Sequence, residues 1–183
     1  MSLISLLALA GAMFLLAITP GPGVFATVAR ALASGVKHSA VVVAGIVTGN
    51  LIFLLFAIFG LSAIAENLHG LFMVIKYTGA AYLIFLGFKL WRKKPKKIQL
   101  NGIKDQSWNS SFLAGLFITL WNPKVILFYL GFLPTFVDLT SLSGMDVFAV
   151  ASVVSLVLGT TMLHMVLQRQ AQGIYFRIQS LKD

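Results

Sequence analysis

Five apolar runs constrain the fold of this chain more than any other feature. They cover residues 3–32, 39–64, 71–91, 108–137 and 147–167, and short polar segments separate them. A helix needs about 20 apolar residues to cross the hydrocarbon core of a bilayer, so each run is long enough to cross once. Charged residues make up only 10% of the chain, against roughly 25% in soluble domains. The sequence therefore predicts an all-α polytopic membrane protein with five transmembrane helices.

The chain has a net charge of +9, and the basic residues outside the apolar runs all lie in polar segments on one side of these helices. They lie in the turn at 30–38, in the linker 92–108 and in the tail 168–183. The turns on the other side, near residue 66 and at 138–146, hold acidic residues and no Lys or Arg. Since basic loops stay in the cytoplasm, the N-terminus is predicted outside and the linker inside. The charge thus reports topology and does not indicate nucleic-acid binding.

The first apolar run is broken by Thr19, Pro20, Gly21, Pro22 and Gly23. Each proline lacks a backbone N–H and frees a carbonyl one turn earlier. Within a bilayer, broken backbone is tolerated only where protein buries it or water reaches it. We therefore expect this break to line a buried or hydrated site.

The fourth run has a similar break at Asn122, Pro123 and Lys124. The two halves are joined after an odd number of spans, so they have opposite orientations in the membrane. Broken helices in two such halves are typical of an inverted-topology repeat with a binding site at the repeat interface.

The chain is therefore expected to form a single membrane domain, 1–183, built as an incomplete inverted 3+3 repeat with broken helices 1 and 4. Repeat one, 1–91, has three spans, the linker 92–108 is cytoplasmic, and repeat two, 109–183, has two spans and a polar tail. The tail is either an amphipathic segment on the cytoplasmic interface or the remnant of a truncated chain.

The breaks predict a site for an anionic group. Helix N-termini attract anions through their free N–H groups, here near Gly23, Val24 and Phe25. Lys124 adds a cation, whose insertion into the membrane costs roughly 2.5–3.5 kcal/mol unless an anion such as a carboxylate offsets it. The alternative is that both breaks are packing kinks, with Lys124 bonded to a freed carbonyl. Asn50, deep in the second run, binds either substrate or a neighbouring helix.

The predicted substrate-binding residues are Thr19, Pro20, Gly21, Pro22, Gly23, Asn50, Asn122, Pro123 and Lys124. Gly45 and Gly49 form a GxxxG pattern, which is better explained by close helix packing than by a site.

Enzyme chemistry has no candidate groups within the apolar runs. They contain no Asp or Glu, the chain has no Cys, and no HExxH or phosphate-binding GxxxxGK[ST] pattern occurs. We expect no cofactor and no metal site, and Lys124 disfavours a metal cation as cargo.

Three segments resemble the lysine-exporter (LysE/RhtB-type) family of bacterial amino-acid efflux proteins. They are Thr19–Pro22, the stretch 76–83 with Gly87, and Trp121–Lys124 followed by Leu133-Pro134, within about residues 5–137. The resemblance implies a secondary transporter that exports amino acids or close derivatives across the bacterial inner membrane, coupled to the proton gradient. The partners are then an amino-acid substrate and the lipid bilayer, and a homo-oligomer stays open. The alternative is a truncated, non-transporting membrane protein, or a subunit whose partner chain supplies a sixth span.

Overall fold

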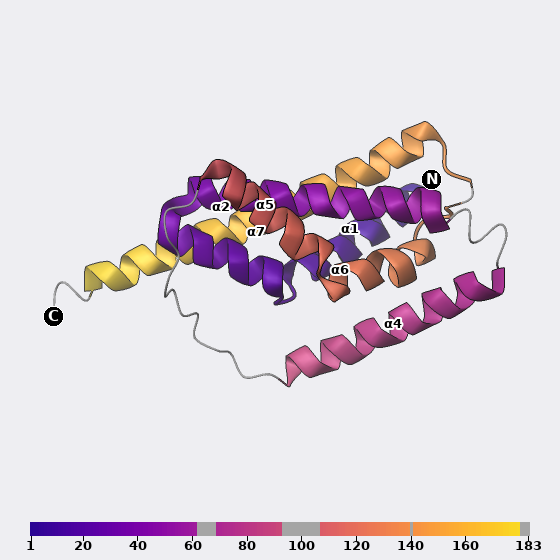
Figure 1. Cartoon of the computed structure of the whole chain (residues 1–183), viewed down its shortest axis with the longest axis horizontal. Helices are drawn as coiled ribbons and strands as arrows, with labels where there is room; N and C mark the ends of the chain where they lie inside the picture. The colour runs from indigo at the N-terminus through magenta and orange to yellow at the C-terminus, as the bar shows by residue number, and fades with distance from the viewer. Residues whose placement is uncertain (62–68, 93–106, 140, 180–183) are drawn as a thin grey trace.

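The computed structural model describes residues 1–61, 69–92, 107–139 and 141–179, and all regular structure in these ranges is helical. The elements are α1 (Leu3–Ile18), α2 (Pro22–Phe56), η1 (Ala57–Leu61), α4 (His69–Trp91), α5 (Trp108–Leu120), α6 (Pro123–Leu127), η2 (Phe128–Phe132), η3 (Leu133–Thr135) and α7 (Gly144–Gln179). The helices run along the long axis of the molecule (Figure 1). The all-α prediction is confirmed. Most of the predicted linker 92–108 and the turn near residue 66 lie outside the described residues.

The helices have the length and composition of a multi-pass membrane protein. Within the described ranges, Pro22–Gly60 and Gly144–Ala171 are each long and apolar enough to cross a membrane. The pair Trp108–Leu120 and Pro123–Thr135, bent by 53°, makes a third span if it is counted as one. The predicted break in the fourth run is therefore confirmed. The count of five spans and the inverted repeat stay predictions.

Gly35 divides α2 into two helical halves, 22–34 and 36–56. Its φ of 83° lies in the left-handed region, which glycine adopts without the steric cost that a Cβ brings. The halves pack against each other, because the Ser39 hydroxyl donates to the Thr27 carbonyl at 2.7 Å. The predicted turn between the first and second runs is thus confirmed at this glycine.

The second half of α2 packs closely on α5 through glycines. A Cβ on Gly45 would collide with the Phe112 carbonyl, and a Cβ on Gly115 would collide with the Val42 carbonyl. Such close approach of two backbones is what small residues allow between membrane helices. The packing role predicted for the GxxxG pattern is therefore confirmed.

A second glycine contact joins α4 to η2. A Cβ on Gly79 would lie 2.9 Å from the Cα of Gly131. The backbones of α4 and η2 therefore touch directly at this point, with no side chain between them.

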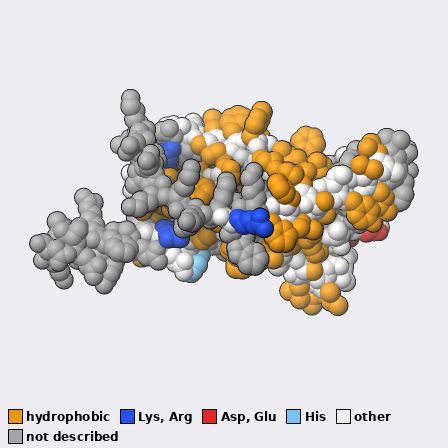
Figure 2. All heavy atoms as spheres, turned by 90° about the horizontal axis from the view of Figure 1, so that it is seen from below, with side chains coloured by type: hydrophobic (Ala, Val, Ile, Leu, Met, Phe, Trp, Pro, Cys, Tyr) orange, Lys and Arg blue, Asp and Glu red, His pale blue; other side chains and the backbone are white. Residues whose placement is uncertain are grey.

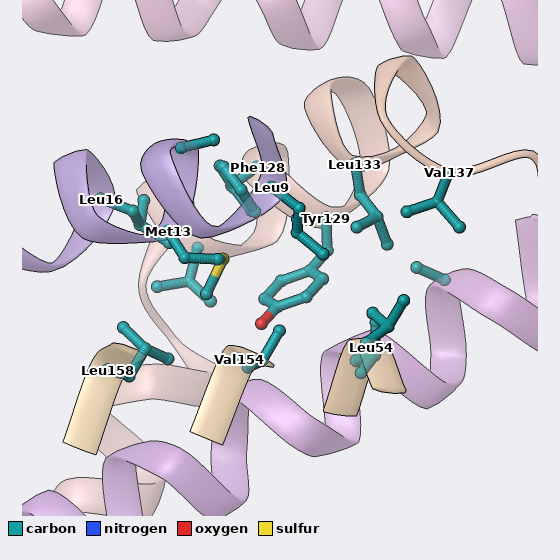
Figure 3. Close-up of a cluster of buried hydrophobic side chains, with 14 of the residues drawn as sticks. Leu9, Met13, Leu16, Leu54, Phe128, Tyr129, Leu133, Val137, Val154 and Leu158 are labelled. Carbon is teal, nitrogen blue, oxygen red and sulfur yellow. The ribbon is translucent and has the colours of Figure 1, made fainter. Parts of the chain in front are cut away.

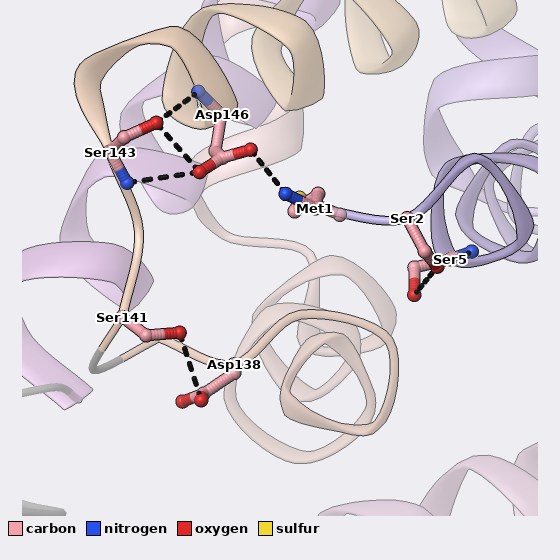
Figure 4. Close-up of polar contacts among 7 residues, drawn as sticks. All are labelled: Met1, Ser2, Ser5, Asp138, Ser141, Ser143 and Asp146. Carbon is pink, nitrogen blue, oxygen red and sulfur yellow. Dashed lines mark hydrogen bonds and ion pairs between the residues drawn. The ribbon is translucent and has the colours of Figure 1, made fainter.

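The start of α7 is tied to the start of the chain (Figure 4). Ser143 and Asp146 cap the helix reciprocally, since the Ser143 N–H donates to Asp146 Oδ2 at 3.0 Å and the Asp146 N–H donates to Ser143 Oγ at 3.2 Å. The amino group of Met1 lies 2.6 Å from the other carboxylate oxygen of Asp146. We refer to this end of the molecule as the Asp146 end.

At its other terminus α7 continues without a break to Gln179. The helix thus includes most of the tail predicted after Leu167, and no proline interrupts the backbone there. The two alternatives for this tail stay predictions.

Buried apolar side chains form a large cluster near the Asp146 end (Figure 3). A smaller cluster of Val42, Val43, Ile46 and Met162 lies toward the Gly35 end. Many large apolar side chains cover the outside, with Ile4 79% exposed and Phe56 70% exposed. Figure 2 shows apolar side chains over much of this face, with described basic side chains toward the left and the middle and acidic ones at the right. An apolar exterior of this kind suits a lipid environment.

Candidate functional site

The first helix break frees a carbonyl at the end of α1. α1 ends at Ile18, and α2 begins with Pro22 at its first helical position. Pro20 has no N–H to donate to the Leu16 carbonyl four residues earlier, so that carbonyl has no partner within the helix. Gly21 is the N-cap of α2 and provides no side-chain hydrogen bond. The break thus leaves both carbonyl acceptors and N–H donors without partners within the helices.

The second break satisfies its own backbone. α6 also begins with a proline, Pro123, at its first helical position. The N-cap Asn122 accepts a hydrogen bond from the Lys124 N–H through its Oδ1 at 3.1 Å. Its own N–H donates to the Thr119 carbonyl at 3.0 Å, which is the carbonyl that Pro123 would leave free.

Lys124 joins the two breaks. Its ammonium donates to the carbonyl of Leu16 at 2.8 Å and to the carbonyl of Thr19 at 3.0 Å. These carbonyls end α1, and the negative end of a helix dipole stabilises a nearby cation. This is the bond to a freed carbonyl that the packing-kink alternative predicted for Lys124. Two hydrogen bonds of the ammonium are used, which leaves one of its three donors for a ligand.

A small cavity lies beside the Lys124 ammonium. Its volume is about 20 Å³, which is room for a water molecule but not for an amino acid. The lining residues come from α1, both halves of α2, α5, α6 and α7. They are Leu16, Ala17, Gly21, Gly23, Val24, Ile46, Asn50, Thr119, Asn122, Lys124, Val125, Leu158 and Met162. The cavity must therefore enlarge before it can hold an amino acid.

One buried acceptor in the lining has no partner. Asn50 is 1% exposed, and its Nδ2 donates to the Ile46 carbonyl at 2.8 Å. Its Oδ1 accepts no hydrogen bond from any described residue. By contrast, the buried hydroxyl of Thr119 donates to the Gly115 carbonyl at 3.0 Å. A buried acceptor without a donor is costly, so Asn50 Oδ1 is a strong candidate for contact with a ligand.

Two residues with N–H donors at the first break line the same cavity. Helix geometry leaves the N–H groups of Gly23 and Val24 without an intrahelical partner, and both residues line the cavity. The expectation for Phe25 was wrong, because its N–H donates to the Gly21 carbonyl at 3.0 Å and closes the first helical turn.

A family model of LysE type translocators matches residues 14–178, which is most of the chain. The chain belongs to this family. The family resemblance inferred from the sequence motifs is thereby confirmed.

Curated relatives agree with the family. An uncharacterized membrane protein of Synechocystis sp. is 38% identical over 143 residues, covering 78% of this chain and 69% of the relative. The leucine efflux protein of Klebsiella pneumoniae is 31% identical over 134 residues, covering 73% of this chain and 63% of that protein. The leucine efflux protein of Salmonella typhimurium is 30% identical over 151 residues, covering 81% of this chain and 71% of that protein. No solved structure matches.

Membership of the LysE type translocators makes the chain a membrane transporter and not an enzyme, and at the level of the family it supports amino-acid efflux. The site described above lies entirely within the matched residues.

In this LysE type translocator, five of the nine predicted site residues line the cavity. They are Gly21, Gly23, Asn50, Asn122 and Lys124. Thr19 takes part through its carbonyl, which binds the Lys124 ammonium.

The three prolines are exposed and do not line the cavity. Pro20 lies between α1 and α2, while Pro22 and Pro123 start half-helices. The prolines thus lie at the breaks and not at the cavity wall. The breaks in turn set the positions of the lining groups.

Sequence reasoning missed Thr119 and the apolar part of the lining. Thr119 sits three residues before Asn122, and a Cβ on Gly49 would lie only 2.8 Å from its Cβ. Gly49 makes room for Thr119, but the GxxxG pattern predicts only close packing and not which residue lies opposite the glycine. The apolar lining residues look like any other residues of an apolar run, so the sequence held no signal for them.

Proposed function

We propose that the protein exports neutral amino acids from the cytoplasm, and that the cavity binds the zwitterionic part of the substrate. The carboxylate accepts hydrogen bonds from the third donor of Lys124 and from the N–H groups of Gly23 and Val24. The ammonium donates to Asn50 Oδ1. The observation that carries this proposal is that the cavity is lined both by the buried Lys124 and by Asn50, whose Oδ1 has no partner among the described residues.

The substrate side chain is expected to be apolar. Most of the lining consists of aliphatic side chains and Met162, and Lys124 is its only ionisable residue. A basic substrate side chain would find no carboxylate among these residues and would be repelled by Lys124. Leucine is therefore the first substrate to test, in agreement with the names of two relatives.

Transport requires the cavity to enlarge and to open on each side in turn. The two half-helices that begin at Pro22 and Pro123 support an inverted repeat, because each follows a break and starts with a proline. We infer five spans, with two in the second repeat, and movement of one repeat against the other.

The orientation follows from charge. Lys37 in the Gly35 turn and Arg92 at the end of α4 mark the cytoplasmic side, while Asp138 and Asp146 mark the outside. The N-terminus is then outside the bacterial inner membrane and the linker 92–108 is cytoplasmic. We also infer that the proton gradient drives export, so an uncoupler that collapses this gradient is expected to stop it.

The decisive experiment is efflux from loaded cells. Cells without their own leucine exporters are loaded with leucine from a dipeptide, and external leucine is followed over time. The protein is expected to speed leucine release, and Lys124→Met is expected to abolish this gain because the cation is lost. Lys37→Met is the matched control, since Lys37 is an exposed lysine in the turn at Gly35.

Two results would contradict the proposal. If no neutral amino acid leaves the cells faster although the protein is in the membrane, the substrate class is wrong. If Lys124→Met exports as fast as the unchanged protein, the role of Lys124 is wrong.

A further inference from the structure

The cavity is sealed toward the Asp146 end by one layer of side chains. Four of the helical segments that line the cavity each carry a fully buried residue one turn further toward that end. These residues are Met13, Leu54, Tyr129 and Val154, and each lies four positions from a lining residue. Residues four apart share a face of a helix, so the layer sits directly on the cavity. We call it the Asp146-side layer.

Tyr129 is the only member of this layer with a polar group. It is 0% exposed, and its hydroxyl has no hydrogen-bond partner among the described residues. Figure 3 shows the hydroxyl pointing toward Val154 of α7. Its ring is held by Phe53, with ring centroids 6.2 Å apart, and by the edge-on ring of Phe128 at 5.5 Å. Phenylalanine would fill the same space without burying an unpaired hydroxyl.

The layer on the opposite side of the cavity differs. It consists of Thr27, Val42, Gly115 and Val166, again each four positions from a lining residue. The Thr27 hydroxyl is satisfied, because it donates to the Gly23 carbonyl at 2.8 Å. The unpaired hydroxyl is therefore a property of the Asp146-side layer and not of both layers.

The backbone around Tyr129 is also irregular. Tyr129 lies in the π-helix η2, which is followed by the 3-10 helix η3. A π-helical turn within a helix is rare and frequently marks a functional site. On its other side η2 packs along α4, and the backbones touch directly where Gly131 meets Gly79.

We propose that Tyr129 is the gate residue on the exit side of the cavity, and that its hydroxyl hydrogen-bonds to the amino acid as it leaves. In the closed structure the ring blocks the path and the hydroxyl is unpaired. When the Asp146-side layer opens, the hydroxyl reaches the polar groups of the departing substrate. This inference rests on the proposed export function and adds an exit contact beyond the cavity.

The test is Tyr129→Phe, which keeps the ring and removes the hydroxyl. The maximal rate of leucine efflux is expected to fall about tenfold, which corresponds to one hydrogen bond lost at the exit step. The internal leucine concentration that gives half the maximal rate is expected to stay unchanged, because every cavity-lining group is still present. The melting temperature of the purified protein is expected to stay equal or to rise. Tyr77→Phe is the matched control, since Tyr77 is 66% exposed on α4.

The outcomes separate the two proposals. If the unchanged protein exports leucine and Tyr129→Phe does so at the same maximal rate, the gate inference is wrong and the export function stands. A clear loss of thermal stability in Tyr129→Phe would show that the hydroxyl is structural and would also overturn the inference. If the unchanged protein exports no amino acid, both proposals fail.

Discussion

The break between α1 and α2 and the break between α5 and α6 both start a half-helix with a proline, yet they treat their backbone groups differently. At the second break, Asn122 caps the new helix with its side chain and closes the Thr119 carbonyl with its N–H. At the first break, Gly21 offers no side-chain cap, and the Leu16 carbonyl is satisfied by Lys124, 108 residues away.

The difference shows that the two breaks act as one unit. Lys124 stands in the first turn of α6, where the helix dipole disfavours a cation, but its ammonium reaches the end of α1, where the dipole favours it. The first break in turn keeps the N–H groups of Gly23 and Val24 free for a ligand. The second break therefore provides charge and rigidity, and the first provides N–H donors on two residues that line the cavity.

The strongest test of this division is to fill the first break with a side chain. In Gly23→Leu the new Cβ would lie 3.3 Å from Ile46 Cδ1 and 3.9 Å from Met162 Cε, and the remaining atoms would occupy the cavity of about 20 Å³. We expect leucine efflux to fall to the background rate. Overpacking is also expected to lower the free energy of unfolding by about 1–3 kcal/mol.

The matched control is Gly11→Leu in α1, because a Cβ at Gly11 meets nothing within 4 Å. That variant is expected to export normally. Normal efflux from Gly23→Leu, with the protein present in the membrane, would show that the substrate does not pass the first break.

A smaller effect is expected when the second break loses its cap. Asn122→Ala removes the acceptor for the Lys124 N–H and is expected to lower the free energy of unfolding by about 1 kcal/mol. Unfolding by SDS in mixed micelles measures this difference. Asn122→Ser restores an N-cap side chain and is expected to recover most of the loss. Equal stability of the alanine and serine variants would mean that the cap does not hold this break.

The smallest effect on stability is expected when the first break gains the cap that it lacks. Gly21→Ser places an acceptor near the N–H groups of Gly23 and Val24 and is expected to raise the free energy of unfolding by only a few tenths of a kcal/mol. The same oxygen competes with the substrate carboxylate for these donors. The leucine concentration for half-maximal efflux is therefore expected to rise, and an unchanged value would argue against a role for these N–H groups in binding.

The sequence by itself determined where the helices break and turn. A proline lacks an N–H in any surroundings, so Pro20, Pro22 and Pro123 end or start helices whatever packs against them. The same holds for Gly35, whose positive φ makes the turn between the halves of α2. The motifs around these residues were also sufficient to predict the family, which the match to residues 14–178 confirmed.

The tertiary structure decided which groups meet. The distance from Lys124 to the end of α1 depends on how α6 packs relative to α1, so the sequence left open whether its ammonium binds a ligand or a freed carbonyl. The apolar cavity lining and the burial of Tyr129 were equally hidden, because every apolar run has several faces that look alike. Backbone chemistry is local and can be predicted from neighbouring residues, whereas the partner of a long side chain is set by contacts between residues far apart in the chain.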